Sequence, residues 1–328
     1  MKTGQASHTA VVVAAGLQLL RHDAAYQSLL PSDAAGQGAA LLNAVCPRLA
    51  HCLQWRWFRR ACHALEQAIQ PGILLHYALR KRALMQHARD SVRAGVTQVV
   101  VLGAGLDTIS TRLLAEFPGL QVIEVDHPAT QSVKQRALDQ TGVAHVPHPL
   151  SAAGFLADHA QRAVSPGTAG GHAPPVARIH YVALDLAQQD LASALAGCAG
   201  FDGGRSTLFI IEGVLMYLRE TMVGRLLRQL QAIAPQNRLA FTWFDTAAGF
   251  EVHSRWLERW LALRNEPFLS GMPRAILPRF LQRYGYVSLD VSESAEQLAP
   301  DEAARLARHG RVLRGEYICL AQCGHFAA

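Results

Sequence analysis

The 328-residue sequence predicts an α/β fold: a doubly wound, mostly parallel, seven-stranded sheet with an N-terminal helical lid. Three observations predict it. Strand-like and helix-like segments alternate from residue 98 onward, as in parallel sheets with helical crossovers. The apolar run 99–102 leads directly into a glycine turn, and several of the predicted strands end in an acidic residue.

The glycine turn is the stretch around which the other elements are arranged. The strand 98–102 is rich in valine, as expected of a strand buried on both faces. Gly103 and Gly105 lack a Cβ where the chain must turn sharply and where a ligand can approach the backbone. Asp107 can cap the helix predicted over 107–117. Strand, glycine turn and helix in this order indicate a ligand-binding turn.

The remaining elements follow the same alternation. Helices are expected at 128–140, 187–196, 219–234, 250–263, 276–284 and 301–311. The predicted strands are 98–102, 120–125, 178–183, 206–211, 238–243, 286–291 and 316–322.

The chain divides into two predicted regions. Residues 1–95 are expected to be a helical cap or lid, and 96–328 the α/β domain. A Pro-, Gly- and His-rich insertion is expected at about 141–177 and a helical insertion at about 246–285. Three helical segments are expected in the lid, Ala39–Arg60, Ala61–Ile69 and Ile73–Arg93. For the aromatic and basic stretch Trp55–Arg60, core packing is favoured over a partner-binding arm.

Composition excludes several classes of protein. Hydrophobic residues make up 50% and charged residues 17%, which argues against disorder. The net charge of +6 comes from arginines spread along the chain, so nucleic acid is not favoured as a partner. No apolar run is long enough to span a bilayer, and Thr9–Leu20 lacks the flanks of a signal peptide. The six cysteines form no Cys-x-x-Cys pair, which indicates a cytoplasmic protein without disulfides or a metal site.

The acids at the strand ends suggest the kind of ligand. Glu124, Asp126, Asp185, Glu212 and Asp245 would all project at the carboxyl edge of the sheet, around the glycine turn. Asp126 lies where a cofactor ribose would need an acceptor. S-adenosylmethionine suits such a pocket because it carries a ribose diol, an adenine amino group, an ammonium and a sulfonium.

A dinucleotide suits the turn less well. The third glycine of Gly-x-Gly-x-x-Gly is absent, and Asp107 would repel a pyrophosphate. A nicotinamide-dependent oxidoreductase therefore stays a less favoured alternative. The second alternative is a catalytically silent protein that binds a nucleotide or a partner.

Four motifs in order resemble the leucine carboxyl methyltransferase family, most closely its bacterial branch. They are the glycine turn at 99–108, the segment 124–134, the Leu-Asp-Leu at 184–186 and the Ile-Glu-Gly-Val-Leu-Met-Tyr-Leu at 211–218. The resemblance implies a class I, Rossmann-like, S-adenosylmethionine-dependent methyltransferase.

The resemblance also implies roles for single residues. Arg80, or failing that Arg82, would pair with the cofactor carboxylate, because a guanidinium matches that group. Tyr217 would face the methyl acceptor as the candidate catalytic residue. The expected cofactor-binding residues are Arg80, Arg82, Gly103, Gly105, Asp107, Glu124, Asp126, Asp185, Leu186 and Glu212.

These observations together predict a carboxyl O-methyltransferase. The expected acceptor is a carboxylate on a small molecule or peptide. Cofactor binding carries over from the resemblance, whereas a protein C-terminal leucine as substrate does not. The acceptor's identity and the oligomeric state are left open.

Overall fold

The computed structural model describes residues 7–24, 26–30, 32–139, 145–146, 178–245, 268–306, 312–324 and 326. One sheet of eight strands runs through the described part of the chain, in the order β3-β4-β2-β1-β5-β6-β8-β7. The strands are β1 (Gln98–Leu102), β2 (Gln121–Asp126), β3 (His145–Val146), β4 (Ile179–Ala183), β5 (Thr207–Ile211), β6 (Asn237–Phe244), β7 (Tyr286–Glu293) and β8 (Glu316–Cys323).

The sheet has the predicted character. All pairings among strands β1 to β6 are parallel. Strand β8 runs antiparallel to both of its neighbours, β6 and β7. All seven predicted strands are present, and the two-residue β3 at the edge is an addition that its length hid from any periodicity argument. All five residues of β1 are buried, which explains why that strand carries no polar alternation.

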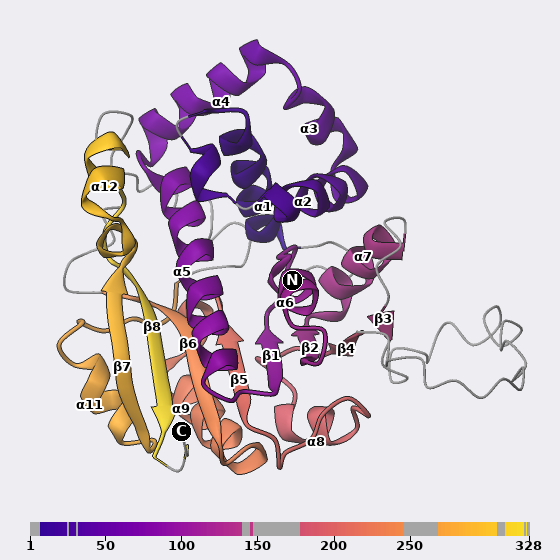
Figure 1. Cartoon of the computed structure of the whole chain (residues 1–328), viewed down its shortest axis with the longest axis vertical. Coiled ribbons are helices and arrows are strands. Elements are labelled where there is room, and N and C mark those ends of the chain that lie inside the picture. The colour runs from indigo at the N-terminus through magenta and orange to yellow at the C-terminus, as the bar shows by residue number, and fades with distance from the viewer. Residues whose placement is uncertain are drawn as a thin grey trace, which may run out of the picture.

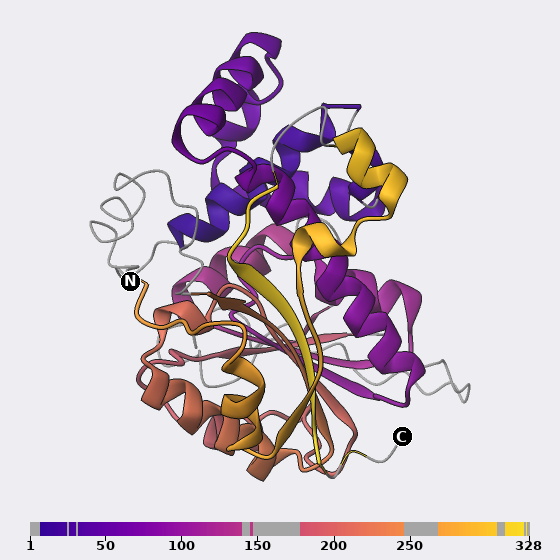
Figure 2. The same ribbon diagram turned by 90° about the vertical axis from the view of Figure 1, so that its left-hand side faces the viewer.

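Helices cover both faces of this sheet. Helix α5 (Ile73–Arg93) and α6 (Ile109–Glu116) lie on one face, and α8 (Leu191–Ala196), α9 (Glu220–Ile233) and α11 (Leu277–Gln282) on the other (Figures 1 and 2). The described helices also include α7 (Pro128–Asp139), α12 (Pro300–Leu306) and the short η1 (Gln27–Leu29), η3 (Leu215–Tyr217) and η4 (Ser294–Gln297).

The N-terminal helices gather beyond the carboxyl ends of the parallel strands (Figure 1). They are α1 (His8–Arg21), α2 (Ser32–Val45), α3 (Pro47–Cys52) and α4 (Arg56–Ile69). Buried apolar residues of α1, Leu42 of α2 and the start of α5 form a cluster separate from the one around the sheet. Leu49 of α3 and Phe58 and Cys62 of α4 are partly buried and pack against that smaller cluster. No helix among the described residues is long and apolar enough to cross a membrane.

The structure corrects one helix prediction in this region. The segment 39–60 was expected to be one helix, but it is broken twice. Pro47 cannot continue a helix, since it lacks an N–H and its ring clashes with the preceding turn, so it starts α3 instead. The second break precedes Arg56, and α4 then runs without interruption through 61–69.

The structure describes only small parts of the two predicted insertions. All of 141–177 except β3, and residues 246–267 of the predicted helical insertion, lie outside the described residues. The predicted helix 250–263 falls there. The predicted helix 301–311 is described only as far as Leu306.

The strand order reverses between β1 and β5, and open α/β sheets bind ligands outside such a switch point. Leu102 at the end of β1 is paired with Val125 on one side and Ile211 on the other. Gly103, Asp126 and Glu212 follow those three paired residues directly. The register therefore sets them side by side at one edge of the sheet.

Candidate active site

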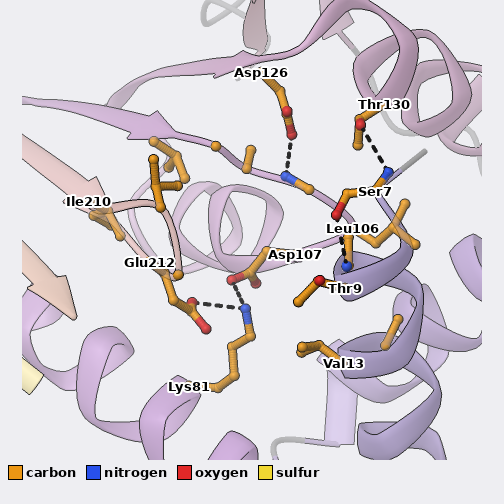
Figure 3. Close-up of a pocket in the computed structure, with 18 of the residues that line it drawn as sticks. Ser7, Thr9, Val13, Lys81, Leu106, Asp107, Asp126, Thr130, Ile210 and Glu212 are labelled. Carbon is orange, nitrogen blue, oxygen red and sulfur yellow. Dashed lines mark hydrogen bonds and ion pairs between the residues drawn. The ribbon is translucent and has the colours of Figure 1, made fainter. Parts of the chain in front are cut away.

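A cavity of about 480 Å³ lies at this edge of the sheet. Its lining comes from the ends of β1, β2 and β5, from α5, and from α1, which closes it on the N-terminal side (Figure 3). This volume falls in the range of pockets for small molecules and cofactors. Most of the sequence-predicted site residues line it: Arg80, Arg82, Gly103, Gly105, Asp107, Asp126, Asp185, Leu186, Glu212 and Tyr217.

The glycine turn follows the backbone path that its composition predicts. Gly103 has a φ of +71°, and a Cβ there would lie 2.3 Å from Cγ2 of Val214. Gly105 has a φ of +50°, and its Cβ would be 3.3 Å from that of Ala10 on α1. Position 103 therefore needs glycine for conformation and for space, and position 105 chiefly for its conformation. Thr108 is the N-cap residue of α6 and makes no side-chain cap bond. Asp107, one residue earlier, accepts from the N–H of Ile109 at 2.9 Å and so stabilises the first turn of the helix.

Asp126 is tied to the same turn. One of its oxygens accepts from the backbone N–H of Gly105, and the other accepts from that of His127 at 2.6 Å (Figure 3). Burial raises the pKa of Asp126 to about 6, although both backbone hydrogen bonds act to lower it. A carboxylate has about four lone-pair sites, so Asp126 keeps acceptor capacity for a hydroxyl in the cavity.

An alternating chain of buried charges forms the floor of the cavity. Lys81 on α5 lies between Asp107 and Glu212, 2.8 Å from an oxygen of the latter (Figure 3). The Nε of Arg80 donates to Glu212 at 2.9 Å, and its Nη1 donates to both oxygens of Glu316 at 3.1 and 3.0 Å. Each cation thus bridges two carboxylates, which fixes both cations at the cavity.

This charge chain continues away from the cavity into the core. Glu316 opens β8 and also contacts Nε2 of the fully buried His76 on α5. The other ring nitrogen of His76 lies 3.0 Å from Oγ of Ser294. Burial alone would raise the pKa of Glu316, but Arg80 and His76 outweigh it and hold that pKa at about 2. Glu316 is therefore a permanent counter-charge for Arg80.

The two acids on Lys81 titrate differently. Burial raises the pKa of Glu212, and Lys81 and Arg80 offset this only in part. Burial also acts to raise the pKa of Asp107, but the Lys81 ammonium outweighs it and lowers that pKa well below its usual range. A proton entering this cluster therefore goes to Glu212 first.

The two candidate arginines have different surroundings. Arg80 is buried against the cavity floor, as described above. Arg82 is a third exposed along its side chain and makes a two-pronged pair with Glu302 of α12, at 2.8 and 3.1 Å. Arg82 borders the cavity, but its guanidinium is engaged by a helix near the C-terminus of the chain.

The other predicted residues at the far end of the cavity follow β4 and β5. Asp185 lines the cavity and also stabilises its own turn, accepting from Ala187 N and Gln188 Nε2, each at 2.9 Å. Leu186 beside it adds an apolar wall. Tyr217, in η3, lines the cavity with its ring 5.8 Å from that of Phe268.

The structure corrects the prediction that Glu124 belongs to the cofactor-binding residues. It is 1% exposed, does not line the cavity, and pairs with Lys134 of α7 at 2.8 Å. The two acids of β2 share a face of the strand, but Glu124 lies two residues before the strand end. It is therefore inside the α/β layer, and its role there is to neutralise a buried lysine.

Four contributors to the site were not singled out from the sequence. Lys81 lies within the basic triplet, and its central position on the cavity floor depends on how α5 is rotated against the sheet. Glu316 carried a usable signal, because it is the one charged residue in the predicted strand 316–322. His76 lies in a helix with several other charged residues, so its position gave no such signal. Helix α1 supplies a whole wall, which no motif indicated.

The strand order, with a glycine turn after β1 and an antiparallel strand inserted at the far edge, is that of the class I methyltransferases. A DUF574 family protein from Streptomyces avermitilis has the same fold: it covers 81% of this chain and 90% of its own, with a TM-score of 0.54 and 16% identity.

Sequence comparison gives the family. Residues 4–231 match the model of the leucine carboxyl methyltransferase family, and the chain belongs to that family. A protein of Mycobacterium ulcerans named "Putative S-adenosyl-L-methionine-dependent methyltransferase" is 31% identical over 244 residues, 71% of this chain and 67% of its own length. A protein of the same name from Mycobacterium bovis is 37% identical over 164 residues, which span 50% of this chain and 38% of that relative.

The family and the fold class predicted from the sequence are thus confirmed. The predicted cofactor, S-adenosyl-L-methionine, is the one for which these relatives are named.

Proposed function

We propose that this protein is an S-adenosyl-L-methionine-dependent O-methyltransferase whose acceptor is a carboxylate of a small molecule or peptide. The observation that carries the proposal is the arrangement of charged residues and glycines at the carboxyl edge of the sheet. Two acids, Asp126 and Glu212, flank a glycine turn that approaches a cavity, and two fixed cations lie below it. The donors and acceptors match a ligand that carries hydroxyls, an ammonium and a carboxylate.

The residues present fit that cofactor. Asp126 would accept from the ribose hydroxyls, and Asp185 with Leu186 would flank the adenine. Glu212 would face the ammonium and Arg80 the carboxylate, with Lys81 between the acids. Gly213 also lines the cavity with a φ of +65°, and a Cβ added there would meet no atom within 4 Å, so its absence leaves room for a ligand.

When bound, the cofactor would supply a methyl group activated by its sulfonium. A carboxylate acceptor is already ionised near pH 7, because ordinary carboxyl pKa values lie near about 4, so the protein needs no general base. Its own contribution is to orient the two reactants and to exclude water. Such alignment can lower a barrier by roughly 7–11 kcal/mol.

Helix α1 supports this role. Its residues Ala10, Val13 and Leu17 line the cavity opposite the strand ends and separate the glycine turn from solvent. Tyr217 and Leu269 line it beyond Glu212, where an acceptor would have access to the transferred methyl group. We propose Tyr217 as an acceptor-positioning residue.

The activity is tested by incubating a host extract with the purified protein and S-adenosyl-L-methionine labelled in the methyl group. A carboxyl methyltransferase transfers label to an acceptor, and the label is released by mild base because the product is an ester. Label that resists base would contradict the carboxylate acceptor. Absence of labelling together with tight cofactor binding would indicate a binding protein without the activity.

A further inference from the structure

The helical pair α3–α4 lies at the end of the molecule opposite α9 and α11 (Figure 1) and packs on the other N-terminal helices. Trp55 and Trp57 at its bend are 43% and 63% exposed, and their rings stack at 5.7 Å. Together with Arg56 and Arg60 they line one open depression. We call the surface formed by Arg48, Trp55, Arg56, Trp57, Arg60 and Leu65 the Trp–Arg surface.

The apolar part of this surface continues along α4. None of the 14 residues of α4 is buried. Trp57, Ala61, Ala64 and Ala68 recur at spacings of four and three on one side of the helix, and Leu65 beside them is 59% exposed. The inner side of α4 packs on the N-terminal core through Phe58 and Cys62, whereas this outer stripe is exposed. An exposed apolar stripe beside two tryptophans is typical of an interaction site.

The polar part of the surface is positively charged. Arg48, Arg56 and Arg60 are exposed, whereas Glu66 is the only acid between residues 46 and 72. Glu66 accepts from the backbone of Gly72 at 2.6 Å, so its charge is directed at the start of α5. Arg59 donates to the carbonyls of Leu53 and Gln54 and fixes the bend itself. The three exposed guanidiniums thus have no nearby acid on these two helices to compensate them.

We propose that the Trp–Arg surface binds the surface of an anionic phospholipid bilayer. An amphipathic helix with tryptophan on its apolar side and arginine on its polar side suits the boundary between headgroups and acyl chains. Guanidiniums pair with lipid phosphates, and indoles are stable where one edge is apolar and the other hydrated. A second copy of the chain fits less well, because the same three arginines would face one another.

The experiment is co-sedimentation of the full chain with vesicles. One set is pure phosphatidylcholine, and the other contains about a quarter phosphatidylglycerol, which gives an anionic surface. We expect binding to the anionic vesicles, weak binding to the neutral ones, and release as the salt concentration is raised.

Two variants separate the parts of the surface. The double variant Arg56→Gln/Arg60→Gln should lower the partition coefficient roughly tenfold or more on anionic vesicles. Trp57→Ser should weaken binding on both kinds of vesicle and reduce the blue shift of tryptophan fluorescence, to which Trp55 still contributes. None of these side chains lines the cavity, so the affinity for S-adenosylhomocysteine should stay at the wild-type value in both variants.

The matched controls lie at the other end of the molecule (Figure 1): Arg225→Gln on α9, 68% exposed along its side chain, and Val287→Ser on β7, 55% exposed. Both should bind vesicles as the wild type does. Wild-type protein that fails to sediment with anionic vesicles would overturn the proposal and leave an acidic protein partner as the better fit. Binding that survives the two surface variants, or self-association that these variants abolish, would overturn it as well.

Discussion

Glu316, 236 residues after Arg80 in the chain, receives two hydrogen bonds from the guanidinium of that arginine, at 3.1 and 3.0 Å. The first strand position of β8 thereby holds a cation from α5 at the floor of the cavity. Because both side chains are almost fully buried, removal of either one takes a counter-charge from its partner in the interior, where such a loss is costly.

A variant of Glu316 tests whether this residue holds Arg80 in place at the cavity floor. Glu316→Gln should lower the free energy of unfolding by about 3 kcal/mol, the usual loss when one partner of a buried pair is removed. It should also weaken binding of S-adenosylhomocysteine, because Arg80 is no longer held for the ligand carboxylate. Urea denaturation and calorimetry measure the two effects.

The control for this variant is Glu296→Gln, which breaks the exposed pair between Glu296 and Arg274. Such pairs contribute about 1 kcal/mol or less, so stability and ligand affinity should both stay close to wild type. Equal behaviour of the two variants would show that Glu316 does not position Arg80.

Asp126 should make ligand binding depend on pH. Its pKa is raised to about 6 by burial, and the ionised form is the better acceptor for hydroxyls. Affinity for S-adenosylhomocysteine should therefore fall as the pH drops through about 6, where the carboxylate takes up a proton. Calorimetry from about pH 5 to 8 measures this, and Asp126→Asn should flatten the profile. Identical profiles for the two proteins would exclude Asp126 as the titrating group.

The raised pKa of Asp126 also makes the stability of the protein depend on pH. The native carboxyl binds its proton more tightly than the unfolded one, so its contribution is fully present below the unfolded pKa of 3.8 and is lost as the pH rises through about 6. As the pH rises from 3.8 through about 6, the free energy of unfolding of the wild type should therefore fall relative to that of Asp126→Asn. A pH-independent difference in urea denaturation would contradict it.

Gly103→Ala should damage the turn by strain and by crowding. The φ of +71° disfavours any side chain by about 1–2 kcal/mol, and Val214 must move to make room. Both the melting temperature and the affinity for S-adenosylhomocysteine should decrease. Gly119→Ala is the control, because its φ is not positive and a Cβ there meets nothing within 4 Å. If both variants bind ligand equally, the turn does not contact it.

Glu124→Gln distinguishes a structural acid from a binding one. The loss of its buried pair with Lys134 should cost about 3–5 kcal/mol of stability, while folded protein keeps its ligand affinity. The exposed pair of Glu116 with Arg89 supplies the control, Glu116→Gln, with a loss of about 1 kcal/mol or less. A fall in ligand affinity without a loss of stability would return Glu124 to the binding site.

The parts of the fold that the sequence predicted are those with local signals. The apolar run of β1, its glycine turn and Asp107 before α6 lie within about ten residues of one another, so periodicity and turn chemistry suffice. Glu124 and Asp126 could not be told apart in the same way. Both lie on one face of β2, and only the position of the strand end shows that one faces the cavity and the other the core.

Other features depend on contacts between distant segments. Three successive residues of α5, Arg80 to Arg82, point in directions about 100° apart, and their order around the cavity is set by how that helix packs on the sheet. The pairing of Glu316 with Arg80 requires β8 to be inserted antiparallel beside β6. No pattern within either segment contains that information.

The central claim is that the acids and glycines at the carboxyl edge of the sheet bind S-adenosyl-L-methionine, and calorimetry with S-adenosylhomocysteine tests it most directly. The account predicts binding of one molecule per chain to the wild type, with Kd on the order of micromolar, and no detectable binding to Asp126→Ala when that variant is folded. Unchanged binding to Asp126→Ala, or wild-type protein that binds NAD and not S-adenosylhomocysteine, would contradict it.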